Sequence, residues 1–175
     1  THETVLLQEA ATALSVKPDG VYIDGTYGRG GHSAILLQQL SPNGRLVVID
    51  KDPTAIADAQ HKYAQDERVK IWQGSFKDFD RALADHQLPL QVHGLLLDLG
   101  VSSPQLDDAE RGFSFMRQGA LDMRMDPTCG LSAADWVNHA PEAEIADVIW
   151  RYGEERFSRQ IARKILQVRS TQPIT

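Results

Sequence analysis

The chain lacks the features of exported, membrane-bound or zinc-binding proteins. Cys129 is its only cysteine, so it can form no intramolecular disulfide and has no second thiol for a zinc site. No apolar run approaches the ~20 residues that span a bilayer. The first residues include Glu3 and Glu9, where a signal peptide would have a basic head. We therefore expect a cytoplasmic protein with no metal and no membrane contact.

Positive charge is also scarce. Lysine and arginine number 18 against 24 acidic residues, which gives a net charge of −6. This balance disfavours a protein that coats nucleic acid nonspecifically, because such binding depends on cations that displace counterions. With 42% hydrophobic residues among 175, the chain can form the core of one domain with an appended piece.

Short apolar runs alternate with stretches of helical period between Gly20 and Leu99, a pattern typical of a parallel sheet with crossover helices. It predicts strands at 21–24, 45–50, 69–72 and 94–98, and helices at 33–40, 54–64 and 79–85. Three of the strands end in aspartate: Asp24, Asp50 and Asp98. Ligands of open α/β sheets bind at the carboxyl ends of strands, so we expect these aspartates at one crevice. Each could instead simply cap the next element.

The region after Asp98 has a different character. Residues 100–130 are rich in Gly, Ser, Pro, Asp and Arg and predict a long loop, which is usually functional or disordered. Two helices should follow, one with Pro141 at its first position and a stop at Gly153, the other over 154–169. Their basic residues are Arg151, Arg156, Arg159, Arg163, Lys164 and Arg169. Such a row is usually a solvated helix face.

A glycine-rich turn follows the first predicted strand, with Gly28, Gly30 and Gly31 at the start of a helix. Glycines there let the backbone turn tightly and approach a ligand. Ser33 stands where a dinucleotide fingerprint requires its third glycine, which weakens an NAD interpretation. An acid followed by small residues resembles the first motif of Rossmann-like methyltransferases, with Thr26 in place of one glycine. The predicted cofactor is therefore S-adenosylmethionine.

Three further residues fit an adenosine-containing cofactor. Asp50 ends the second strand, where an acid can accept hydrogen bonds from both ribose hydroxyls. Phe76 follows the third strand and could stack on adenine, although core packing explains it equally well. His32 could bind the cofactor's carboxylate, but a lone histidine is more often structural.

Several longer strings together resemble the RsmH family, also called MraW. They are HETVLL at 2–7, DGTYGRGGH at 24–32, DKDP at 50–53, DLGVSSPQLD at 98–107, RGFSF at 111–115, LDMRMD at 121–126 and YGEER at 152–156. The resemblance covers essentially the whole chain. It implies S-adenosylmethionine-dependent methylation of the exocyclic N4 of a cytidine in the 16S rRNA of the bacterial small ribosomal subunit.

The resemblance also implies roles for residues. Gly30, Gly31 and His32 would hold the methionine end of the cofactor and Asp50 its ribose, with Phe76 at the adenine. Asp24 and Gly28 would belong to the same pocket, which Asp98 and Gln105 would complete. The candidates for hydrogen-bonding the target amine and receiving its proton are Asp98, Ser102 and Ser103.

The predicted organisation is α/β: a Rossmann-like class I methyltransferase sheet with an inserted α-helical domain. Residues 1–104 would form the cofactor-binding core, and 105–175 the active-site loop and the start of an RNA-facing helical domain. The family's sheet has further strands, so the resemblance implies that this chain carries only the first ones and is a fragment. Three alternatives stay open: a methyltransferase for DNA or a small amine, an inactive cofactor-binding and RNA-docking module, and, least favoured, a dehydrogenase.

Overall fold

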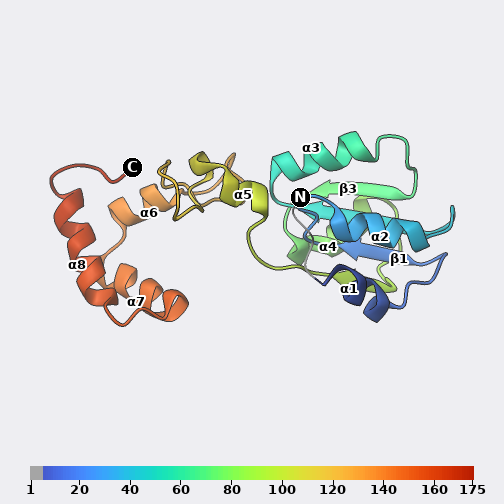
Figure 1. Cartoon of the computed structure of the whole chain (residues 1–175), viewed down its shortest axis with the longest axis horizontal. Coiled ribbons are helices and arrows are strands. Elements are labelled where there is room, and N and C mark those ends of the chain that lie inside the picture. Colours follow the sequence, from blue (N-terminus) through green and yellow to red (C-terminus); the bar gives the residue numbers. More distant parts are fainter. Residues whose placement is uncertain (1–5) are drawn as a thin grey trace. The chain divides into compact units, whose positions relative to one another are not determined.

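The computed structural model describes residues 6–175 (Figure 1). The first residues of the string at 2–7 lie outside this described part. Contacts divide the chain into two compact units, Thr1–Ser102 and Ser103–Thr175. None of the helices in the described part has the length and apolarity that crossing a bilayer requires.

The first unit is a four-stranded parallel sheet in the order β3-β2-β1-β4. Its strands are β1 (Val21–Asp24), β2 (Arg45–Asp50), β3 (Val69–Gln73) and β4 (Gly94–Leu96). Its helices are α1 (Leu7–Leu14), α2 (Gly31–Gln39), α3 (Pro53–Lys62) and α4 (Phe79–Asp85), with a short 3₁₀ helix η1 (Phe76–Asp78). This strand order is that of a doubly wound, Rossmann-like sheet, as predicted.

The core lies on both faces of the sheet because β2 is apolar throughout. Leu46 and Val48 pack on one face in a cluster that includes residues of α2 and α3. Val47 and Ile49 pack on the other face against α4. All four side chains have no exposed surface, as expected of a strand covered by helices on both sides. Figure 1 shows α2 in front of the sheet, α3 above β3 and α4 behind the sheet.

The predicted limits of β1, β2 and α4 are confirmed, and β3 is one residue longer than predicted. The prediction of a fourth strand as far as Asp98 is wrong, since β4 ends at Leu96. Its pairing partner β1 ends at Asp24, opposite Leu96. The Asp98 N–H donates instead to the Thr26 hydroxyl, at 2.7 Å. The strand therefore ends where its neighbour ends.

Two other helices in the first unit differ from prediction by one or two residues at each end. Helix α2 begins at Gly31 instead of residue 33, and its N-cap is Gly30. Helix α3 begins at Pro53 and ends at Lys62, two residues before the predicted end. Its start is fixed by the Asp52 carboxylate, which accepts the Thr54 N–H at 2.9 Å and so caps the helix.

The second unit is helical. It contains α5 (Ser103–Asp107), η2 (Ala109–Arg111), α6 (Ala133–His139), α7 (Glu142–Gly153) and α8 (Ser158–Arg169). Helices α7 and α8 pack around Ile145 and Ala162, both fully buried. The prediction that 100–130 is all loop is wrong at α5 and η2, and α6 was not predicted. A capping box starts α6: the Ser132 hydroxyl accepts the Asp135 N–H and the Asp135 side chain accepts the Ser132 N–H.

The predicted start of the last helix is also wrong, because α8 begins at Ser158 and not at residue 154. Helix α7 includes Gly153, and the left-handed residue that ends it is Glu154, with φ of 50°. The Glu155 carboxylate accepts the Phe157 N–H at 2.8 Å, which holds the connection as a turn. Pro141 is the N-cap of α7, one position before the predicted one.

Candidate cofactor site

The turn between β1 and α2 has the conformation that its glycines allow. Gly28 and Gly30 have φ of 56° and 75°, in the left-handed region that favours glycine. A methyl group added at Gly30 would lie 2.6 Å from the Tyr27 ring, whereas at Gly28 its nearest neighbour would be Ser102 Cβ at 3.9 Å. The turn is therefore tightly packed against the Tyr27 ring at Gly30 and open at Gly28.

Asp24 lies beneath this turn and is completely buried. Its carboxylate accepts hydrogen bonds from the Ser33 hydroxyl at 2.6 Å and from the Thr26 N–H at 3.2 Å. Burial raises the pKa of Asp24, against the lowering effect of the two donors. Asp24 thus fixes the turn from below, and its direct contact with a cofactor stays a prediction. Ser33, which stands at the third fingerprint position, supplies the stronger of these two bonds.

Asp50, at the end of β2, also holds the glycine-rich turn. One carboxylate oxygen accepts the Gly28 N–H at 2.8 Å and the other accepts the Asp52 N–H at 2.9 Å. Burial raises the pKa of Asp50, and these backbone donors act in the opposite direction. Each carboxylate oxygen can accept more than one hydrogen bond, so Asp50 retains acceptor capacity for a ligand hydroxyl.

A network that the sequence did not reveal joins the turn to α3. The Tyr27 hydroxyl donates to Asp58 of α3 at 2.8 Å, and Lys62 forms an ion pair with Asp58 at 2.9 Å. Lys62 also donates to the Arg29 carbonyl at 2.9 Å. Although burial opposes it, the bonds from Lys62 and Tyr27 hold the pKa of Asp58 below its ordinary value. The turn and α3 are therefore joined across more than 25 residues of sequence.

His32 has an unsatisfied atom at the start of α2. The side chain is 6% exposed, and its Nε2 is buried with no hydrogen-bond partner in the described part of the chain. Buried polar atoms are nearly always paired, so an orphan of this kind calls for an explanation. An anionic group at the helix N-terminus would supply one, because backbone N–H groups and the helix dipole favour negative charge there.

Phe76 lies beside the carboxyl end of β1. A methyl group added at Gly25 would lie 2.9 Å from Phe76 Cβ and 2.6 Å from Leu97 Cδ2. Phe76 is half-buried and follows the Ser75 cap of η1. It thus flanks the same sheet end as Asp24 and Asp50, and its stacking on adenine stays a prediction.

The remaining candidates are divided between the units. Asp98 is exposed, and its backbone N–H is bonded to the hydroxyl of Thr26 in the turn, a contact that the sequence pattern did not predict. Ser102 lies next to Gly28. Ser103 and Gln105 belong to α5 in the second unit, where Gln105 is buried. Their part in the site stays a prediction.

The predicted basic residues of α7 and α8 have different surroundings. Arg151 pairs with Asp147 at 2.9 Å, and Arg163 pairs with Glu142 at 3.7 Å. Arg169 donates to the Val137 and Ala140 carbonyls at 2.6 and 2.8 Å and so caps the end of α6. Arg169 therefore has a structural role within the second unit, whereas Arg151 and Arg163 form ion pairs with acids of α7.

The strand order, the left-handed glycine turn after β1 and the acid at the end of β2 are those of a Rossmann-like fold of the kind that methyltransferases use. The chain belongs to the MraW methylase family, whose family model matches residues 1–175. Among solved structures, one assigned as an rRNA methylase from Clostridium thermocellum is similar, with 24% identity and a TM-score of 0.48. That similarity covers 58% of this chain and 54% of the other. The chain thus spans about half the length of that protein.

Proposed function

We propose that the chain carries the cofactor site of an S-adenosylmethionine-dependent methyltransferase that acts on the exocyclic N4 of a cytidine in 16S rRNA of the small ribosomal subunit. The match to the MraW methylase family over the whole chain carries this proposal. The geometry at the carboxyl end of the sheet supports it, because it combines an open glycine turn, an acid after β2 and an orphaned histidine nitrogen.

The residues present fit this cofactor. His32 Nε2 and the α2 N-terminus suit the carboxylate of its methionine end, near Gly30 and Gly31. Asp50 has the acceptor capacity for the ribose hydroxyls, and Phe76 supplies an aromatic face beside the same strand ends. Asp24 acts from beneath by holding the turn, since it is fully buried. Gln105 stays a predicted cofactor-binding residue.

When bound, the cofactor supplies an electrophilic methyl group on a sulfonium. The chain's own task is then to align the target nitrogen and exclude water, because an in-line displacement depends mainly on geometry. The N4 lone pair of cytosine is delocalised into the ring, so acceptors next to the amine favour its reactive pyramidal form. Asp98 is an exposed carboxylate that could accept the released proton, and Ser102 and Ser103 could accept hydrogen bonds from the amine.

An RNA acceptor is compatible with the chain's net negative charge. The target base must leave any stack to reach the sheet edge, which favours an unpaired or flipped nucleotide. An assembled ribosomal subunit would supply shape and position, so that nonspecific attraction is not required. Arg159 of α8, which forms no ion pair in the described part of the chain, is available for a phosphate.

Transfer of a tritiated methyl group tests this proposal. Small ribosomal subunits are incubated with labelled S-adenosylmethionine and the full-length product of the gene, and the RNA is digested to nucleosides. We expect label in N4-methylcytidine from the small subunit, with none from large subunits as the control acceptor. Asp98→Asn should reduce the rate, whereas Asp80→Asn, an exposed acid of α4, should not. Absence of label from every cytidine would refute the proposed acceptor.

The same experiment separates the alternatives. Label in DNA or in a small amine, with none in RNA, would favour a different acceptor for the same donor. Binding of cofactor and RNA without transfer would favour a docking module. Competition by NAD for the site would favour the dehydrogenase.

A further inference from the structure

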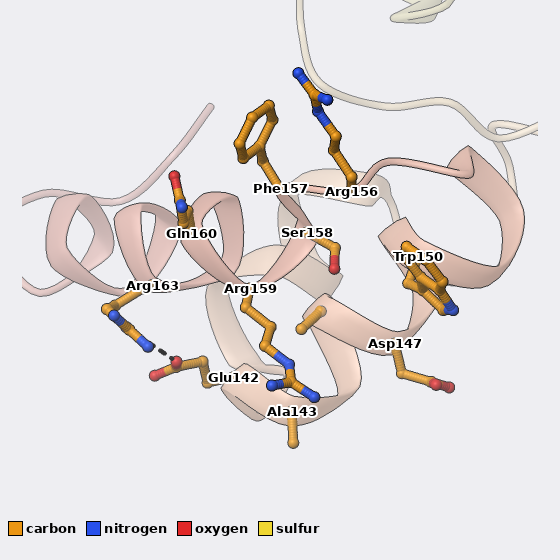
Figure 2. Close-up of a pocket in the computed structure, with 11 residues that line it drawn as sticks. Glu142, Ala143, Asp147, Trp150, Arg156, Phe157, Ser158, Arg159, Gln160 and Arg163 are labelled. Carbon is orange, nitrogen blue, oxygen red and sulfur yellow. Dashed lines mark ion pairs between the residues drawn. The ribbon is translucent and has the colours of Figure 1, made fainter.

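Residues of α7, of α8 and of the connection between them line a groove in the second unit, with a volume of about 800 Å³. It lies beside the turn at 154–157 that joins the two helices. The residues that matter for its chemistry are Glu142, Asp147, Trp150, Arg156, Phe157 and Arg159. Figure 2 shows these side chains. None of them belongs to the candidate cofactor site.

Two aromatic side chains line the groove without belonging to the core of the unit. Trp150 is 57% exposed and Phe157 46% exposed, and neither is part of the cluster around Ile145. The Arg156 guanidinium lies 4.6 Å from the centre of the Phe157 ring. Exposed aromatic faces and stacked guanidinium groups are the surfaces on which proteins stack unpaired bases.

Two arginines of the lining have no acidic partner among residues 6–175: Arg156, which stacks on the Phe157 ring, and Arg159. Both acids of the lining are already paired: Asp147 with Arg151 and Glu142 with Arg163. Arg159 forms no ion pair with any residue between 6 and 175. In Figure 2 its side chain extends from α8 across to Ala143 of α7. A phosphate could therefore bind there without displacing an existing partner of Arg159.

We propose that this groove binds one unpaired nucleotide of the RNA substrate, with its base stacked on Trp150 and its phosphate held by Arg159. This rests on the proposed function, because RNA is the substrate that it names. The acids of the lining interrupt the row of arginines, which disfavours a duplex whose two strands need a continuous basic surface. Grooves that bind a partner helix are predominantly apolar, whereas most of the residues that line this one are charged or polar, beside two alanines and the two aromatic residues.

Fluorescence anisotropy with a labelled, unstructured RNA of about 12 nucleotides tests the groove. The variants are Trp150→Ala and Arg159→Gln, and each has a matched control outside the lining. Tyr152→Ala removes a more exposed aromatic, 84% exposed, from the same helix as Trp150. Lys164→Gln removes the same charge as Arg159→Gln from an exposed position of α8. Circular dichroism checks that all four remain folded.

We expect each groove variant to weaken binding about tenfold, the range found when a stacking residue is removed, and each control to stay within about twofold. Arg159→Gln should also reduce the salt dependence by about one phosphate contact. A duplex of the same sequence should bind more weakly than the single strand. Equal losses in groove variants and controls would overturn the proposal, as would absence of RNA binding by the wild type.

Two further outcomes keep this proposal separate from the methyl-transfer reaction. If N4-methylcytidine forms and the groove variants bind RNA as the wild type does, the groove proposal alone fails. If the groove variants lose RNA binding but no N4-methylcytidine forms, the proposed acceptor alone fails. Sedimentation gives a third check, because a change of mass in Trp150→Ala without a change in RNA affinity would assign the groove to a second copy of the chain.

Discussion

The buried hydrogen bond between Ser33 and Asp24 gives the sharpest prediction for the first unit. Both residues are completely buried, and the Ser33 hydroxyl donates to the Asp24 carboxylate at 2.6 Å. Ser33→Ala leaves one oxygen of a buried acid without its donor. We expect a loss of about 2–3 kcal/mol in the free energy of unfolding, since hydrogen bonds to charged groups and unsatisfied buried acceptors each have effects of this size.

The loss should depend on pH in a direction that the structure fixes. Burial raises the pKa of Asp24 above its ordinary value of 3.8. At pH values between 3.8 and the folded-state pKa, the folded chain therefore binds more protons than the unfolded one. The contribution of Asp24 to stability is therefore fully present below pH 3.8 and is lost as the pH rises through the folded-state pKa. Removing a donor raises that pKa further, so Ser33→Ala should lose more stability toward neutral pH than at acid pH.

Urea denaturation followed by circular dichroism, at a series of pH values between about 4 and 8, measures this effect. The matched control is Ser41→Ala, which removes an exposed hydroxyl bonded to Asp19 and should cost less than about 0.5 kcal/mol. Asp24→Asn should abolish the extra pH dependence that Ser33→Ala introduces. A Ser33→Ala variant as stable as the control, or one that gains stability toward neutral pH, would refute the reasoning.

Three other substitutions test separate parts of the structure. Gly30→Ala should destabilise by at least about 1–2 kcal/mol because of its left-handed φ, whereas Gly153→Ala, with no neighbouring atom within 4 Å, should change stability by less than about 1 kcal/mol in urea denaturation. Thr26→Val should slow methyl transfer while Thr26→Ser preserves it, because only a hydroxyl can accept the Asp98 N–H. Equal rates for the two variants would contradict this role of Thr26. Arg169→Gln should cost about 1–3 kcal/mol by freeing two carbonyls of α6, and Lys164→Gln should cost little in the same unfolding assay.

The sequence predicted the central sheet well because its strands are short apolar runs with clear ends. Residues 21–24 and 45–50 are bounded by glycine, arginine and aspartate, and their limits are confirmed. The glycine turn was predictable for the same reason, since three glycines within four residues directly follow a strand. The end of β4 was not predictable from its own residues. It depends on where its partner β1 ends, 72 residues earlier in the chain.

The supports of the site escaped prediction because they are contacts between distant residues. Nothing in the local sequence links Tyr27 to Asp58, which lies 31 residues later. Thr26 and Ser33 looked like departures from a glycine pattern, yet their side chains bond the backbone of Asp98 and the carboxylate of Asp24. A hydroxyl at a position that usually favours glycine was the available signal, because such a residue needs a partner when it is buried.

Helix α6 was missed for a different reason. It has seven residues and no fully buried side chain, so its apolar period is too short to detect. The capping box of Ser132 and Asp135 was the local signal for its start. Its far end depends on Arg169, 29 residues beyond Ala140, which no local pattern could indicate.

Binding of two related ligands tests the central claim, that the turn at Asp24–His32 holds the methionine end of the methyl donor. S-adenosylhomocysteine carries that end, whereas methylthioadenosine has the same adenosine without the amino acid carboxylate. Calorimetry should show that the wild type prefers S-adenosylhomocysteine, and that His32→Leu loses this preference while it binds methylthioadenosine as before. Equal losses for both ligands, or a wild type that binds neither, would contradict the account.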